Sequence, residues 1–280
     1  MATIIGGITT SHIPAIGNAI AREQQNNPYW KDFFDGYRPV RDWLDKHKPD
    51  VAVVIYNDHG LGFFLDQMPT FAIGAAHEYR NEDEGWGIPT LPPFKGDAEL
   101  SWHIIEGMVR DEFDITSCQE LAVDHGFTVP MQLLWPELGL SMPPAIPISA
   151  NTVQHPIPTM KRCLDFGKAL GRAIRSYPKD IKVVVLGTGG LSHQLDGERA
   201  GHINPEFDKM CMEKIISDPE ALTKISRHEL IRQAGSQGSE FIMWMMMRGA
   251  LGNVKALHQN YHIPISNTAA GTMIMESIDS

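Results

Sequence analysis

The stretch Val51-Ala-Val-Val-Ile-Tyr-Asn-Asp-His59-Gly60 decides the expected fold. Its first six residues carry no charge and are mostly β-branched, which is typical of a strand buried on both faces of a parallel sheet. The run then ends abruptly at Asn57-Asp58-His59-Gly60, which could also be an ordinary polar turn. In open α/β sheets, ligands bind at the carboxyl ends of the strands. We therefore predict a central strand over residues 51–56 and treat His59 as a candidate site residue.

Three further histidines occupy similar positions. His12 follows an apolar start at Ile4, and His193 follows the run that begins at Val183. His125 stands in Leu121-Ala-Val-Asp-His125-Gly126. Because the carboxyl ends of parallel strands share one edge of a sheet, we expect the four histidines to converge.

Strand and helix patterns alternate along the remainder of the chain. The expected strands are 3–8, 51–56, 68–74, 113–118, 145–150, 182–186 and 272–276. The expected helices are 36–47, 97–110, 129–134, 159–176, 206–216, 219–225 and 238–248. Residues 78–97 are rich in Glu, Asp, Gly and Pro and predict a long surface excursion. This alternation predicts a single α/β domain over residues 1–280, with a mostly parallel central sheet and helices on both faces.

Composition narrows the class of protein. The net charge of −10 argues against nucleic acid as a partner, because phosphate binding needs a basic surface. Three widely spaced cysteines form neither a disulfide framework nor a zinc-ribbon pattern. We find no signal peptide and no apolar run of about 18 residues that could cross a membrane. The expectation is a cytoplasmic enzyme.

Convergent histidines with a carboxylate favour a metal site. Two imidazoles and one carboxylate suit non-haem Fe(II) and also catalytic zinc, so the residues alone leave the metal open. Glu240 is an attractive carboxylate because its neighbours are apolar, although an exposed glutamate at a helix N-terminus explains it equally well. The glycines at 187–190 match no nucleotide-binding pattern, and no GxSxG hydrolase motif is present.

Longer motifs add a resemblance. The segments that carry it are Gly7-Ile-Thr-Thr-Ser-His12-Ile-Pro, Tyr56-Asn-Asp-His59, Asp83-Glu-Gly-Trp-Gly87, Val123-Asp-His125-Gly, Gly187-Thr-Gly-Gly-Leu-Ser-His193-Gln, Gly235-Ser-Gln-Gly-Ser-Glu240 and Tyr261-His-Ile-Pro-Ile-Ser-Asn267-Thr. With them the sequence resembles, essentially from end to end, the class III extradiol ring-cleavage dioxygenases. Within that family it resembles the beta (catalytic) subunits that act on protocatechuate.

The resemblance implies a set of residue roles. His12, His59 and Glu240 would hold Fe(II), which selects Glu240 as the carboxylate. His193 would be the acid/base residue, and His125 would lie beside the positions of O₂ and substrate.

The resemblance also implies a reaction. It is Fe(II)-dependent meta cleavage of a carboxylated catechol by O₂, with protocatechuate 4,5-cleavage to 4-carboxy-2-hydroxymuconate semialdehyde as the first expectation. Gallate or 3-O-methylgallate would suit the same diol-plus-carboxylate recognition. Ser266 and Asn267 match the family segment near the ring carboxylate.

A partner is also implied. Relatives of this kind pair the catalytic chain with a small helical alpha subunit, and the end of this chain at Ser280 leaves no room for a fused one. We expect a separate small subunit in an assembly such as α2β2. The apolar residues of 60–74 and 127–135 could be its contact surface, and core packing explains them equally well. A zinc-dependent hydrolase on the same scaffold and a non-enzymatic binding module are the alternatives.

Overall fold

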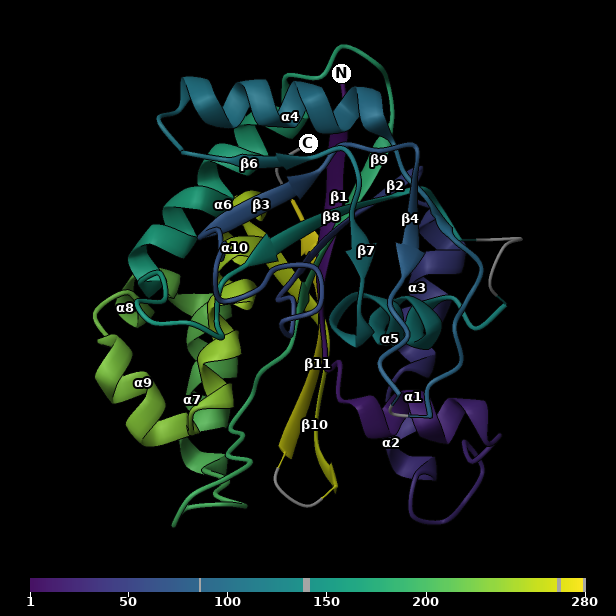
Figure 1. The fold of residues 1–280 in the computed structure, drawn as a ribbon, viewed down its shortest axis with the longest axis vertical. Coiled ribbons are helices and arrows are strands. Elements are labelled where there is room, and N and C mark those ends of the chain that lie inside the picture. Colours follow the sequence, from purple (N-terminus) through teal and green to yellow (C-terminus); the bar gives the residue numbers. More distant parts are fainter. Residues whose placement is uncertain (86, 138–141, 266–267, 279–280) are drawn as a thin grey trace.

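A computed structural model describes residues 1–85, 87–137, 142–265 and 268–278 of the chain (Figure 1). The strands are β1 Thr3–Thr10, β2 Val51–Tyr56, β3 Phe71–Gly74, β4 Glu78–Asn81, β5 Phe94–Lys95, β6 Thr116–Cys118, β7 Ala122–Val123, β8 Ala145–Ala150, β9 Lys182–Thr188, β10 Val254–Ile265 and β11 Thr268–Ser277. The helices are α1 Pro14–Ala21, α2 Lys31–Asp35, α3 Arg38–His47, α4 Ala98–Arg110, α5 His125–Leu134, α6 Met160–Arg175, α7 Pro205–Ser217, α8 Pro219–Leu222, α9 Arg227–Ala234, the 3₁₀ turn η1 Gln237–Glu240, and α10 Phe241–Leu251.

Eight strands form the central sheet, in the order β10-β11-β1-β9-β2-β8-β3-β6. The neighbours β1, β9, β2 and β8 are parallel to one another. The antiparallel pairs β1–β11, β10–β11 and β3–β8 lie toward the two edges. The carboxyl ends of four central strands therefore meet at one edge, and the prediction of a mostly parallel central sheet is confirmed.

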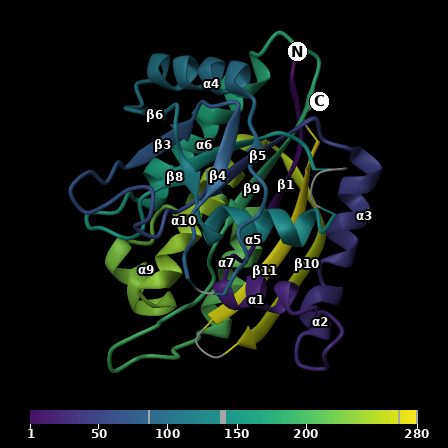
Figure 2. The same cartoon turned by 45° about the vertical axis from the view of Figure 1, so that its right-hand side comes forward.

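Strand β2 shows why the sheet is covered on both sides. Alternate side chains of a strand point to opposite faces, and all six residues of β2 are buried. Val53 and Ile55 belong to the core beneath α4, α6 and α10, whereas Val54 and Tyr56 belong to the core beneath α1, α3 and α5. Figure 2 shows α5 and α1 in front of the sheet, with α3 beside them. Helices on both faces are thus confirmed.

Helices α6 and α10 pack with their backbones almost in contact. A Cβ atom added to Gly167 would lie 2.0 Å from the carbonyl oxygen of Met246 and 2.8 Å from Cα of Gly249. The side chains of Phe241–Met247 on α10 are all buried. Because α10 begins directly after Glu240, this tight packing fixes the position of Glu240 near the sheet.

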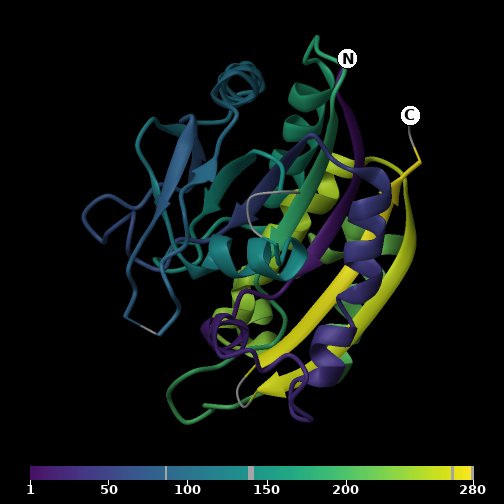
Figure 3. The same cartoon turned by 90° about the vertical axis from the view of Figure 1, so that its right-hand side faces the viewer.

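Some elements differ from expectation. Strand β10, helix α1 and helix α9 were not predicted, and the strand expected over 68–74 is confined to Phe71–Gly74. Strand β10 contains charged and polar residues and Pro264, because it forms the edge of the sheet beside β11 (Figure 3). An edge strand lacks the continuous apolar run that marks β2.

The expected surface segments are partly wrong. Residues 127–135 are buried and cannot be contact surface, because α5 packs against β2. The 78–97 excursion contains β4 and β5, which join β7 in a small three-stranded sheet. Among the described residues, none of the helices is both long and apolar enough to span a bilayer.

Candidate metal centre

The four histidines that follow apolar runs line one cavity of about 600 Å³. His12 and His59 stand two and three residues beyond the ends of β1 and β2, and His193 follows β9. His125 is the first residue of α5. The structure thus brings together the histidines that the sequence suggested. Besides these histidines the cavity is lined by Ser11, Ile13, Pro14, Ala15, Asn18, Leu61, Glu84, Gly190, Leu195, Gln237, Glu240 and Thr268.

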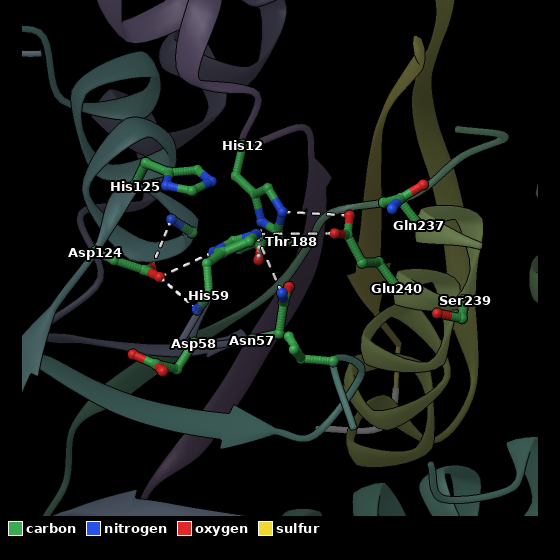
Figure 4. Close-up of polar contacts among 12 residues, drawn as sticks. His12, Asn57, Asp58, His59, Asp124, His125, Thr188, Gln237, Ser239 and Glu240 are labelled. Atoms are coloured by element: carbon green, nitrogen blue, oxygen red, sulfur yellow. Dashed lines mark hydrogen bonds and ion pairs between the residues drawn. The ribbon is translucent and has the colours of Figure 1, made fainter. Parts of the chain in front are cut away.

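His12, His59 and Glu240 form a cluster with one ligand atom from each residue within 4.8 Å of the others. Nε2 of His12 lies 3.2 Å from Oε2 of Glu240, and Nε2 of His59 lies 3.9 Å from Oε1 of the same carboxylate. Figure 4 shows the two rings and the carboxylate pointing toward one another from three different elements. The sequence left the position of Glu240 open, and the structure places it in this cluster, 7% exposed.

The cluster fits a divalent cation. Nε2 of His12 is buried, and its polar neighbour at 3.2 Å is Oε2 of Glu240. Burial raises the pKa of Glu240, but the charges of His12 and His59 outweigh burial and lower it to about 2. Glu240 is therefore an anion facing two imidazole nitrogens, a donor set suited to Fe(II) or Zn(II).

The far side of each ring has a polar partner. Nδ1 of His12 lies 3.0 Å from Oγ1 of Thr188, the last residue of β9. Nδ1 of His59 lies 2.8 Å from Oδ2 of Asp124, which also accepts the backbone N–H of His59 at 2.7 Å. Such outer partners fix the ring orientation and the tautomer of metal-binding histidines. With Nδ1 bonded in each ring, Nε2 is the atom directed at the cluster.

The pair of His59 and Asp124 is strongly polarised. Burial disfavours protonated His59, but the nearby charge and hydrogen bond of Asp124 raise the pKa of His59 to about 9. Burial likewise opposes the ionised form of Asp124, yet His59 lowers the pKa of that carboxyl to about 2.

His193 is held by its backbone. Its N–H donates to the carbonyl of Ala234 at 2.6 Å, and its carbonyl accepts from the N–H groups of Gln237 and Gly238 at 3.2 Å. The buried Nε2 atom of its ring has no hydrogen-bond partner among the described residues. Burial lowers the pKa of His193. Its neutral ring is thus suited to accept a proton from a molecule in the cavity.

His125 stacks on His59 with 3.9 Å between the ring centroids. The carboxylate of Glu84 contacts both its ring Nδ1 and its backbone N–H. Burial lowers the pKa of His125.

Sequence reasoning missed the residues that support this cluster. Asp124 directly precedes His125 in the quoted Val-Asp-His-Gly motif, and Thr188 ends a predicted strand, so both had a local signal. Glu84 stands in the quoted Asp83-Glu-Gly-Trp-Gly87 motif, but the motif gave no indication that its carboxylate contacts His125. Asn57, whose Nδ2 lies 3.1 Å from Nε2 of His59, was read as part of the turn. Ser266 and Asn267 lie outside the described residues.

Comparison with known proteins identifies the family. Residues 6–271 match the family described as the catalytic LigB subunit of aromatic ring-opening dioxygenase. A gallate dioxygenase of Pseudomonas putida is 43% identical over 199 residues, which is 70% of this chain and 58% of that protein. A 2,3-dihydroxyphenylpropionate/2,3-dihydroxicinnamic acid 1,2-dioxygenase of Photorhabdus laumondii is 30% identical over 203 residues, or 72% of this chain and 60% of that protein.

A solved structure supports the fold. An uncharacterized protein from Escherichia coli K12 superposes with a TM-score of 0.56 at 12% sequence identity, covering 96% of this chain and 99% of that one. The chain spans 58–60% of the length of the two dioxygenases above. Because the family match covers nearly the whole sequence, this chain belongs to the LigB family of extradiol aromatic ring-opening dioxygenases.

Proposed function

We propose that this protein catalyses Fe(II)-dependent extradiol cleavage of a carboxylated catechol by O₂. The observation that carries the proposal is the convergence of His12, His59 and Glu240 next to His193 in one cavity. Two neutral donors and one carboxylate are the ligand set of many non-haem Fe(II) oxygenases, which need free positions for substrate and O₂.

The ligand atoms of His12, His59 and Glu240 lie within 4.8 Å of one another, and all three residues line the cavity. Fe(II) held there would lower the pKa of the two catechol hydroxyls and bring the diol and O₂ together. Glu240 supplies a single negative charge, so part of the cation's charge remains to favour an ionised diol. The outer partners Thr188 and Asp124 keep both rings in place while the substrate enters.

His193 is the proposed general base and acid. Its Nε2 is unpartnered among the described residues, so it is ready to accept a hydroxyl proton from the diol. A histidine with a lowered pKa is neutral at physiological pH, as a base must be. The same ring, once protonated, can return the proton to an oxygen of the opened product.

Gallate and protocatechuate are the proposed substrates, and gallate should be tested first. The 43% identity to a gallate dioxygenase favours gallate. Protocatechuate, which lacks one ring hydroxyl, keeps the same diol and carboxylate, and its 4,5-cleavage stays a prediction. 3-O-methylgallate is the third member of the set.

A separate small helical subunit, in an assembly such as α2β2, is proposed to cover the cavity. Leu195 lines the cavity and is 55% exposed. Phe64 and Leu65, on the loop that follows His59, are 58% and 73% exposed. Apolar side chains around a polar site are suited to a protein contact.

Oxygen uptake by anaerobically Fe(II)-loaded protein tests the reaction. Gallate, protocatechuate and 3-O-methylgallate are supplied in turn while visible absorbance is followed. We expect O₂ consumption with a new visible chromophore, and no O₂ consumption by Zn(II)-loaded protein. If the Fe(II) protein consumes no O₂ with any of the three, with or without an added small subunit, the proposal is wrong.

A further inference from the structure

The carboxylate of Glu84 contacts His125 at two points. Oε1 accepts the backbone N–H of His125 at 2.5 Å, and Oε2 contacts ring Nδ1. Both side chains are only 6% exposed, and both residues line the cavity. A buried carboxylate that uses both oxygens on one residue restrains that residue strongly, because charge-assisted hydrogen bonds are roughly twice as strong as neutral ones.

Glu84 arrives from a distant and irregular part of the chain. It lies between β4 and β5, in the excursion that sequence reasoning assigned to the surface. The side chain of Ile88, four residues later, lies against Gly17 of α1. Glu84 and Ile88 therefore each contact a helix beside the cavity, and Glu84 makes its contact at the first residue of α5. A negative charge at a helix N-terminus is itself favourable.

The contact determines which nitrogen of His125 carries hydrogen. An ionised carboxylate can only accept hydrogen bonds, so Nδ1 must be the protonated nitrogen. In the neutral ring, Nε2 then carries a lone pair and can accept. The ring of His125 stacks on that of His59 and meets the ring of His12 edge-on, with 3.9 and 5.8 Å between the ring centroids. These two contacts hold the plane of the ring. Ring position and tautomer are thus both fixed.

We propose that Glu84 is a positioning residue that holds His125 with hydrogen on Nδ1, so that Nε2 accepts a hydrogen bond from a hydroxyl group of the bound aromatic diol. The inference rests on the proposed function for the identity of the ligand. It separates the roles of the two histidines: His125 has a carboxylate partner that sets its tautomer, whereas Nε2 of His193 has no partner among the described residues.

The Glu84→Gln variant reverses this arrangement at nearly constant size. One amide oxygen can still accept the backbone N–H of His125, but the NH₂ group then faces Nδ1 and can only donate. The ring of His125 would then carry its hydrogen on Nε2, so that Nε2 would donate a hydrogen bond into the cavity and no longer accept one. We expect kcat/KM to fall about ten- to a hundredfold, the range for lost outer-shell partners.

Asp83→Asn is the matched control. It removes the same charge from the preceding residue, which is exposed and whose carboxylate accepts only the N–H of Gly85 among the described contacts. An asparagine can still accept that bond. We expect wild-type kcat/KM in Asp83→Asn, and wild-type metal content in both Asp83→Asn and Glu84→Gln.

A double-mutant cycle tests whether Glu84 acts through His125. His125→Phe keeps an aromatic ring but has no nitrogen. If Glu84 acts through this histidine, the double variant Glu84→Gln/His125→Phe is no slower than His125→Phe alone. Losses that multiply, or wild-type kcat/KM in Glu84→Gln, would overturn the proposal.

The tautomer can be read without turnover. Nitrogen-15 NMR of histidine-labelled, Zn(II)-loaded full-length protein distinguishes a ring protonated on Nδ1 from one protonated on Nε2, with His125→Phe assigning the signal. We expect Nδ1–H in the wild type and Nε2–H in Glu84→Gln. A wild-type ring with hydrogen on Nε2 overturns the inference even if the variant cannot be made.

If the wild type consumes no O₂ with any of the diols, the proposed function fails, and this spectrum still decides the role of Glu84.

Discussion

Asp124 and His59 are joined through both the ring and the backbone: Oδ2 of Asp124 lies 2.8 Å from Nδ1 of His59 and accepts its N–H at 2.7 Å. The second oxygen of Asp124 accepts the N–H of Gly126 at 2.9 Å. One buried carboxylate therefore connects the loop after β2 to the start of α5. Asp124 also sets the pKa of His59, and therefore how readily a binding metal displaces the proton of this ring into solvent.

Metal binding should release a proton. Burial opposes protonation of His59, but Asp124 raises its pKa to about 9, so the metal-free ring is protonated at pH 7. A metal needs the neutral ring, so we expect about one proton released per metal bound. Apparent affinity should then rise about tenfold per pH unit and level off as the pH approaches that pKa. Calorimetry at pH 7 in two buffers of different ionisation enthalpy measures the release, and a value near zero would contradict the assignment of His59 as a ligand.

Replacing Asp124 should weaken the metal site. In Asp124→Asn the ring of His59 loses its anionic partner, and we expect the metal affinity, corrected for proton competition at His59 from its measured pH dependence, to fall about ten- to a hundredfold. Proton release at pH 7 should also decrease, because the pKa of His59 returns toward its ordinary value. Asp66→Asn, an exposed position in the loop after His59, makes the same charge change and should leave both quantities unchanged. Equal affinities in the two variants would show that Asp124 does not support the site.

His193→Phe should separate metal binding from turnover. The ring of His193 is not part of the cluster of His12, His59 and Glu240, so iron content should stay at the wild-type value. Loss of a general acid/base lowers kcat by about 10²- to 10⁴-fold. His228→Gln, at an exposed histidine of α9, is the control. Normal turnover by His193→Phe would remove His193 from the mechanism.

The wild-type pH profile gives a second test of His193. Burial lowers its pKa, so the neutral base persists at neutral pH and is lost only in more acidic solution. With metal saturating at every pH, kcat/KM should be flat from about pH 7 to 8 and fall below an apparent pKa of less than ~6.5. A limb centred above pH 7 would point to a different group.

The central strands could be read from the sequence because burial on both faces leaves a direct trace. The six residues of β2 form one uncharged run, and the histidine beyond it follows from parallel topology. Strand β10 leaves no such trace, since it lies at the sheet edge and contains His258, Gln259 and Asn260. Its place depends on pairing with β11.

Some residues of the candidate site could be predicted from the sequence, and others could not. His12 and His59 were visible because strand ends place them, and Asp124 could have been found beside His125. Glu84 and His125 are 41 residues apart, with β5, α4, β6 and β7 between them, and no periodicity encodes a contact over that separation. Residue-level reasoning left Glu240 open between a buried and an exposed reading, because its burial depends on how α10 packs.

The packing of α10 on α6 should make Gly167 sensitive to substitution. Its replacement by alanine puts a Cβ atom 2.0 Å from the carbonyl oxygen of Met246, a backbone atom of α10 that cannot turn aside. Overpacking costs about 1–3 kcal/mol, whereas the better helix propensity of alanine returns up to about 1 kcal/mol. The clash should win, and we expect the free energy of unfolding in urea to fall by about 1–2 kcal/mol.

Gly167→Ala should also affect metal binding. Relief of the clash requires α10 to move away from α6, and α10 begins at Phe241, directly after Glu240. Gly167→Ala should therefore lower metal affinity as well as stability, although it touches none of the proposed ligands. Lys168→Ala, at the exposed neighbouring position, should change the free energy of unfolding by less than about 0.5 kcal/mol and leave metal affinity unchanged. Wild-type stability in Gly167→Ala would mean that the two helices separate freely, and the packing of α10 would then not explain why Glu240 stands where it does.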